Sequence, residues 1–180
     1  MNSNGMYDLL ERQVRELLAG ETDFVASAGN FAAFLYHELP DVNWAGFYLA
    51  TPSGELVLGP FAGRPACTRL APGRGVCGAA ASRRATLVVD DVAAFVDHIV
   101  CDAASRSEIV VPLFDRGTLW GVFDCDTPAA RAFQRGRPHG NRTARARLQR
   151  LGAGAGAVRT LSNTQAKFPS AIAPIVRNTA

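Results

Sequence analysis

The stretch Ser107–Thr127, SEIVVPLFDRGTLWGVFDCDT, predicts two antiparallel strands joined by a tight turn. Both halves are rich in β-branched and aromatic residues, and the residues DRG between them have turn-forming chemistry. Because side chains alternate along a strand, Asp124 and Asp126 share one face while Cys125 points to the other. Glu108 opens the first strand, so we expect the hairpin to bring three carboxyl groups to one end of a sheet.

Further strands are predicted before this hairpin. VNWAGFYLA, beginning at Val42, and ELVLGPF, beginning at Glu55, are separated by the turn residues TPSG, and TLVVDDV, beginning at Thr86, predicts a short strand. Trp44 and Tyr48 lie four residues apart in the first of these segments and therefore share a face. They form either core packing or an aromatic wall for a small ligand.

Three helices are predicted to cover the sheet. Apolar residues at helical spacing indicate amphipathic helices over Tyr7–Leu18 and Asp23–Leu39. A glycine-rich loop then leads into a short helix that begins at about Val76. Cys77 falls in the first turn of that helix, where backbone N–H groups and the helix dipole favour a thiolate, and Cys67 lies in the preceding loop.

Length and composition favour one domain with room for a tail. A chain of 180 residues that is 48% hydrophobic can bury one ordinary core. No run approaches the ~18 apolar residues of a membrane span. The N-terminus also lacks the basic start and apolar block of a signal peptide. We therefore expect a cytoplasmic protein with no membrane partner.

Charge divides the chain after Phe133. All 16 acidic residues and 10 of the 19 basic residues precede this point, so the net charge is −6 before it and +9 after it. We interpret residues 1–133 as the folded domain and residues 134–180 as an atypical basic tail rich in Arg, Gly and Ala. Two origins of the tail stay open, namely disorder and a change of reading frame. An RNA-binding arm is disfavoured because RGG repeats and interleaved aromatic residues are absent, so we expect no nucleic-acid partner.

The four cysteines are spaced by 10, 24 and 24 residues, with no Cys-x-x-Cys pair. This spacing does not favour a structural zinc site, and we expect no metal. We interpret Cys125, which lies between two aspartates on a strand, as a small buried hydrophobic residue. Cys101 opens the run CDAASRSE that leads to Glu108, and it is the candidate nucleophile.

The crowded carboxyl groups have a predictable effect on one another. In a closed site they repel and lose hydration, so at least one pKa should rise and leave a protonated carboxyl that can donate. A cysteine beside such an acid suits the reduction of a polar S=O group.

The runs NWAGFYL, ELVLGPFAGRPAC, GRGVCG, VVDDVAAFVDHIVCDAASRSEIVVPLF and GVFDCDTP resemble the free methionine-(R)-sulfoxide reductases, from about Asn30 to Phe133. The resemblance implies an α+β fold of the GAF type, with a six-stranded antiparallel sheet, helices packed on it and a small enclosed pocket. It also implies reduction of free L-methionine (R)-sulfoxide to L-methionine, regeneration by thioredoxin, and no metal or organic cofactor. Members of the family are often dimeric, which predicts a homodimer.

The resemblance assigns catalytic roles to individual residues. Cys101 would be the nucleophile that becomes a sulfenic acid, Cys77 the resolving thiol that closes a disulfide with it, and Cys67 an auxiliary resolving thiol. Glu108, assisted by Asp126, would protonate the departing oxygen. For Cys77 and Cys101 to form this disulfide, a loop that carries one of them would have to move.

The implied substrate-binding residues are Trp44, Tyr48, Glu108, Asp124 and Asp126, of which Asp124 would help hold the substrate ammonium. An alternative from another class is a non-catalytic GAF module that binds a small ligand or senses redox state through a regulatory disulfide. That alternative predicts binding without turnover.

Overall fold

Alternating apolar residues form an antiparallel sheet of six strands in the computed structural model. The structure describes residues 3–133, with side chains from Leu9 onward in the first helix. The strand order is β3-β2-β1-β6-β5-β4. The strands are β1 Trp44–Ala50, β2 Leu56–Gly63, β3 Arg69–Leu70, β4 Leu87–Val89, β5 Ser107–Asp115 and β6 Thr118–Thr127.

Both predicted hairpins are confirmed. β1 pairs antiparallel with β2, and β5 pairs antiparallel with β6. The β5–β6 turn places Arg116 and Gly117 at positive φ, 47° and 80°, which is the conformation that tight hairpin turns require. β6 lies in the middle of the sheet, between β1 and β5, so its alternate residues face two different environments.

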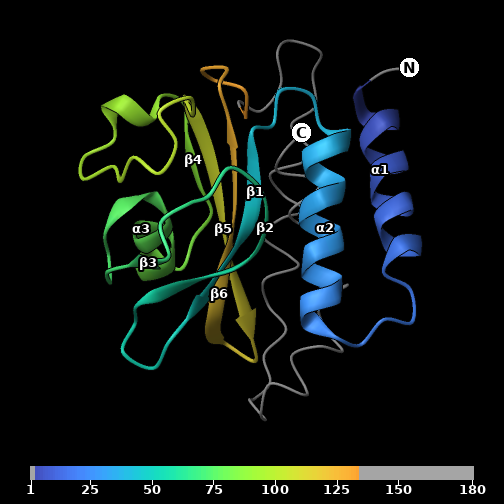
Figure 1. Ribbon diagram of the computed structural model, residues 1–180, viewed down its shortest axis with the longest axis horizontal. Helices are drawn as coiled ribbons and strands as arrows, with labels where there is room; N and C mark the ends of the chain where they lie inside the picture. The colour runs from blue at the N-terminus through green and yellow to red at the C-terminus, as the bar shows by residue number, and fades with distance from the viewer. Residues whose placement is uncertain (1–2, 134–180) are drawn as a thin grey trace.

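The helices are α1 Ser3–Leu17, α2 Phe24–Glu38 and α3 Gly75–Arg83, with a 3-10 turn, η1, at Val92–Ala94. Asp23 caps α2, because its carboxylate accepts a hydrogen bond from the N–H of Ala26 at 2.9 Å. Figure 1 shows α2 against one face of the sheet with α1 outside it, and α3 against the opposite face. The six-stranded fold with helices on the sheet is therefore confirmed.

The face of the sheet under α1 and α2 carries an apolar core, which we call the helix face. Its centre is aromatic: the ring of Phe123 lies 5.1 Å from that of Phe47 and 5.2 Å from that of Phe31. Cys125 is fully buried in this core, so its interpretation as a small hydrophobic residue is confirmed. The face under α3 carries a second cluster that includes Trp44 and Tyr48, and we call it the pocket face.

Among the helices that the structure describes, none is long and apolar enough to cross a bilayer. The basic tail predicted over residues 134–180 lies outside the described residues.

Candidate active site

Strand register assembles the predicted carboxyl groups on the pocket face. Asp126 of β6 lies opposite Trp44 of β1 on one side and Glu108 of β5 on the other, so these three residues form one row across the sheet. Asp124 lies one row further along, and Tyr48 follows two rows beyond Trp44 on β1. The hairpin therefore brings the three acids together as its alternation predicted.

A cysteine of α3 lies against these carboxyl groups. Cys77 lies in the first turn of α3, is buried, and has its Sγ atom 4.0 Å from Oε1 of Glu108. The glycine after it, Gly78, permits the loop before α3 to pack closely, because a Cβ there would lie 2.8 Å from the backbone carbonyl carbon of Gly73. The helix is thus held with its first turn over the acids.

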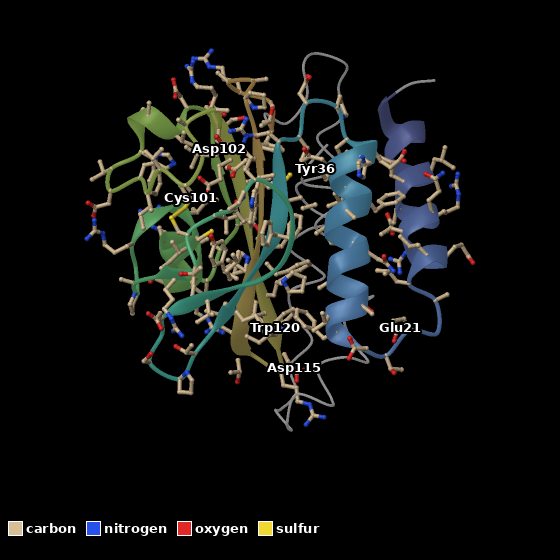
Figure 2. The ribbon with its side chains drawn as sticks, viewed as in Figure 1. Glu21, Tyr36, Cys101, Asp102, Asp115 and Trp120 are labelled. Carbon is tan, nitrogen blue, oxygen red and sulfur yellow. A yellow bond between two sulfur atoms is a disulfide. The ribbon has the colours of Figure 1, made fainter. Side chains whose placement is uncertain are left out.

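A disulfide joins Cys67, in the loop between β2 and β3, to Cys101, in the loop between η1 and β5. The two Cα atoms lie 5.7 Å apart, a normal separation for such a bond. Figure 2 shows this bond beside the labelled Cys101. Cys101 is exposed and Cys67 is partly buried, while Cys77 is a free thiol.

This pairing differs from the expected one, in which Cys77 closes the disulfide with Cys101. The physical reason lies in the two aromatic residues of β1, which fix the loop that carries Cys67. The hydroxyl of Tyr48 donates to the carbonyl of Cys67 at 3.0 Å, and Nε1 of Trp44 donates to the carbonyl of Arg64 at 3.1 Å. The Cys67 loop is therefore anchored beside Cys101, whereas Cys77 lies against the carboxyl groups.

The loop that carries Cys101 is anchored by residues that sequence reasoning missed. Nδ2 of Asn43 donates to Oδ2 of Asp102 at 3.2 Å and to Oγ of Ser105 at 3.1 Å. Asp102 also accepts from the N–H of Ala104, which closes a local turn. The Asp and Ser of CDAASRSE are turn-forming residues and were a signal for this turn, but nothing in the sequence pointed to Asn43.

A cavity of about 40 Å³ lies between these elements. It is large enough for ordered water and small for an amino acid, so a substrate would require the disulfide-closed loops to open. Every predicted site residue except Cys67 lines it, and Cys67 is bonded to a lining residue, Cys101. The lining residues that were not predicted are Pro65, Ala66, Leu70, Gly75, Val76, His98, Ile99, Asp102 and Ser105.

Burial is the main influence on the carboxyl groups. It raises the pKa of Glu108 and of Asp126 well above the usual range, and the neighbouring charge of Asp124 raises both further. Burial raises the pKa of Asp124 to about 7, although hydrogen bonds from Cys77, Glu108 and the Cys125 backbone act to lower it. The predicted rise in at least one carboxyl pKa is confirmed, because burial favours the protonated form of all three carboxyl groups.

The first turn of α3 does not lower the pKa of Cys77, although its position there favours a thiolate. Burial raises the pKa of the Cys77 thiol well above its usual range, and the nearby carboxylates of Asp124 and Glu108 raise it further. These effects outweigh the dipole of α3. The free energy needed to bury a thiolate next to negative charge exceeds the stabilisation that the helix terminus provides. Cys77 is thus a protonated thiol in the resting site.

The arrangement combines an exposed disulfide, buried carboxyl groups that can donate protons, and an unpartnered acceptor on a residue that lines the cavity. Oδ1 of Asp124 is buried and has no hydrogen-bond partner among the described residues. A buried acceptor of this kind suits a ligand with a positive charge or an N–H group. One group of described side chains, Cys77, Glu108 and Asp124, also has atoms close enough together to hold a metal ion.

Comparison with known proteins agrees with this geometry. The family model described as GAF domain matches residues 29–155. The free methionine-R-sulfoxide reductase of Escherichia coli is 50% identical over 127 residues, which span 71% of this chain and 76% of that protein.

Solved structures give the same result. The free methionine-R-sulfoxide reductase from Neisseria meningitidis, in complex with its substrate, aligns with a TM-score of 0.71 and 46% identity over 74% of this chain and 80% of that chain. The reduced form of fRMsr of Staphylococcus aureus aligns with a TM-score of 0.67 and 42% identity over 80% of this chain and 88% of that chain.

Proposed function

The chain belongs to the GAF-domain family and, within it, to the free methionine-R-sulfoxide reductases, and we propose that it reduces free L-methionine (R)-sulfoxide through a Cys67–Cys101 disulfide. The observation that carries the proposal is that this disulfide borders a pocket lined by three carboxyl groups, Glu108, Asp124 and Asp126. A redox pair beside protonated acids suits the removal of oxygen from a sulfoxide.

The first step takes place at Cys101. Its thiolate attacks the sulfur of the sulfoxide while Glu108, assisted by Asp126, protonates the departing oxygen. The pKa of Glu108 is raised by burial and by neighbouring charge, which keeps a proton available on it near neutral pH. The protonated oxygen then passes from the substrate sulfur to Sγ of Cys101 as the S–S bond formed by the attack breaks. Methionine leaves with the electron pair of that bond on its sulfur, and Cys101 becomes a sulfenic acid.

The second step closes the disulfide. The Cys67 thiol attacks the sulfenic sulfur of Cys101, the S–O bond breaks, and water leaves with the proton from Cys67. Over both steps, two thiols and one sulfoxide give one disulfide, one sulfide and one water. We assign Cys67 rather than Cys77 as the main resolving thiol because the structure bonds Cys67 to Cys101 and places Cys77 against Glu108.

Substrate recognition uses the carboxyl groups and the aromatic wall. Oδ1 of Asp124 is an unpartnered buried acceptor, and we assign it to the substrate ammonium. Trp44 and Tyr48 line the same cavity, with rings stacked 6.0 Å apart, and contact the apolar part of the substrate. A methionine within a peptide lacks the free ammonium, so the acidic pocket selects the free amino acid.

Reduction of the disulfide completes the cycle. Cys101 is exposed, so an external dithiol protein can attack the bond, and we assign thioredoxin to this role. The thioredoxin dithiol is oxidised to a disulfide as Cys67 and Cys101 are reduced. No metal or organic cofactor takes part in the proposed reaction, and a homodimer and a cytoplasmic location belong to the same proposal.

The test is turnover of free L-methionine (R)-sulfoxide by the full chain, coupled to thioredoxin, thioredoxin reductase and NADPH. We expect NADPH consumption with wild type and with Cys125→Ser, whose side chain lies in the core of the helix face, and none above background with Cys101→Ser. We also expect no turnover of the (S) epimer or of N-acetylated substrate. A folded wild-type protein that binds the sulfoxide without turnover would support the redox-sensing alternative instead.

A further inference from the structure

Cys77, Glu108 and Asp124 lie together at the base of the cavity, and the catalytic steps above give Cys77 no part. From this group we propose a binding site for a thiophilic divalent cation of the Zn²⁺ or Cd²⁺ class. The site is inhibitory, because an ion there would occupy Glu108 and Asp124, which the proposed function uses for the substrate.

The spacing of the ligand atoms suits such an ion. One ligand atom from each of the three residues lies within 4.8 Å of the others, and Sγ of Cys77 is 4.0 Å from Oε1 of Glu108. Zinc bonds of about 2.0–2.3 Å in a tetrahedron place ligand atoms roughly 3.5 Å apart, so closure needs side-chain shifts of about 1 Å. All three residues are buried, which fixes their directions.

An independent observation points to a ligand at this place. Asp124 is only 6% exposed, and its Oδ1 atom has no hydrogen-bond partner among the described residues. A buried carboxylate oxygen without a donor is costly, so it requires a bound cation, a donor group or water. Cys77, Glu108 and Asp124 all line the same cavity, and that cavity has room for an ion with a water molecule in its fourth position.

The donor set determines the class of metal. One thiolate and two carboxylates suit zinc and cadmium, whereas magnesium and calcium take oxygen ligands only. Binding converts the Cys77 thiol to a thiolate, and its proton, with any proton carried by the carboxyl groups, passes to the solvent. No electron transfer occurs, so the oxidation state of the protein does not change.

The disulfide form isolates this site. Cys67 and Cys101 are bonded to each other and cannot act as thiolate ligands, and Cys125 lies in the core of the helix face. Cys77 is therefore the free thiol that faces the cavity among the described residues. A bound ion would occupy Glu108 and Asp124, which the proposed function assigns to substrate, so metal and substrate exclude each other.

The experiment titrates Cd²⁺, and then Zn²⁺, into the disulfide form of the full chain without substrate. We expect one equivalent to bind by calorimetry, with a thiolate-to-Cd²⁺ absorption band in the near ultraviolet and release of protons into the buffer. Cys77→Ser should abolish the band and weaken binding by at least about 10–100-fold, while the matched control Cys125→Ser should change neither. Because neither readout uses turnover, the result is independent of the proposed function.

If Cys77→Ser does not fold, a second variant tests the same metal site. Asp124→Asn retains the thiol but removes one anionic ligand, and we expect it to weaken Cd²⁺ binding about tenfold or more. Unchanged affinity in either variant, or binding to wild type without the thiolate band, would place the ion elsewhere and overturn the proposal.

Discussion

The helix face and the pocket face are formed by alternate residues of the same strands, yet they differ in polarity. On β6, Phe123 and Cys125 point into the apolar core, whereas Asp124 and Asp126 point into the cavity. The apolar face stabilises the domain by excluding water. The carboxyl groups of the pocket face lower the stability of the fold, because burying them is unfavourable. The same burial makes them proton donors for the reaction. Stability and activity should therefore respond to different substitutions.

The largest expected effect is loss of turnover on the pocket face. Glu108→Gln removes the proposed proton donor, and we expect kcat to fall about 10²–10⁴-fold. The free energy of unfolding should not fall, because an uncharged amide replaces a carboxyl group whose pKa burial raises well above its usual range. Thioredoxin-coupled turnover and urea denaturation measure the two quantities. Glu55→Gln, at an exposed ion pair with Arg69, is the matched control, and equal activity of both variants would remove Glu108 from the mechanism.

The next effect is loss of stability on the helix face. Phe47 is fully buried between Phe31 and Phe123, so we expect Phe47→Ala to lower the free energy of unfolding by about 3–5 kcal/mol. The kcat of the protein that remains folded should be close to that of wild type. Phe114→Ala, at a ring that is 37% exposed, should cost less than about 2 kcal/mol. Equal costs for the two variants in urea denaturation would contradict the division between the faces.

The third effect is a dependence of stability on pH that comes from the pocket face. The pKa of Asp124 is about 7 in the folded protein and near its ordinary value of 3.8 in the unfolded chain, so the folded state binds more protons between these values. Its contribution is therefore fully present below about pH 4 and is lost as the pH rises through 7. Asp124→Asn should flatten the decline in unfolding free energy over this range, by on the order of a few kcal/mol at pH 8. An unchanged slope would show that Asp124 is not buried in the charged state.

The smallest effect concerns the link between the aromatic wall and the disulfide. Tyr48→Phe removes the hydroxyl that donates to the carbonyl of Cys67, and we expect a loss of about 0.5–1.5 kcal/mol in stability. Disulfide closure after a single turnover should slow by a few-fold, because the Cys67 loop is held less firmly. Tyr36→Phe, on α2, is the control for loss of a hydroxyl away from the pocket. Closure at the wild-type rate in Tyr48→Phe would mean that the loop is positioned without this bond.

Local periodicity was sufficient to predict the position of the acids and five of the six strands, all except the short β3 at Arg69–Leu70. The alternation of β6 and the turn at Arg116 and Gly117 determine which residues of the hairpin lie opposite one another, so Glu108 and Asp126 were predictable neighbours. Apolar spacing predicted α2 to within one residue at each end, whereas α1 begins at Ser3, before the predicted start at Tyr7.

The pairing of the cysteines was not predictable in the same way. Cys67 and Cys101 are 34 residues apart, and their contact depends on how two loops are anchored by Tyr48 and Asn43, which lie on or next to β1. The protonated state of Cys77 likewise depends on carboxyl groups from other strands. The position of Cys77 at a helix terminus therefore suggested an activated thiol. Its burial beside acids instead raises its pKa and keeps the thiol protonated.

The proposed chemistry of the pocket face depends on a disulfide between Cys67 and Cys101. Fully reduced protein, given one equivalent of free L-methionine (R)-sulfoxide without thioredoxin, should be alkylated under denaturing conditions and mapped by peptide mass spectrometry. We expect a disulfide between Cys67 and Cys101, with Cys77 and Cys125 both alkylated. A disulfide between Cys77 and Cys101, formed in the first turnover, would contradict it.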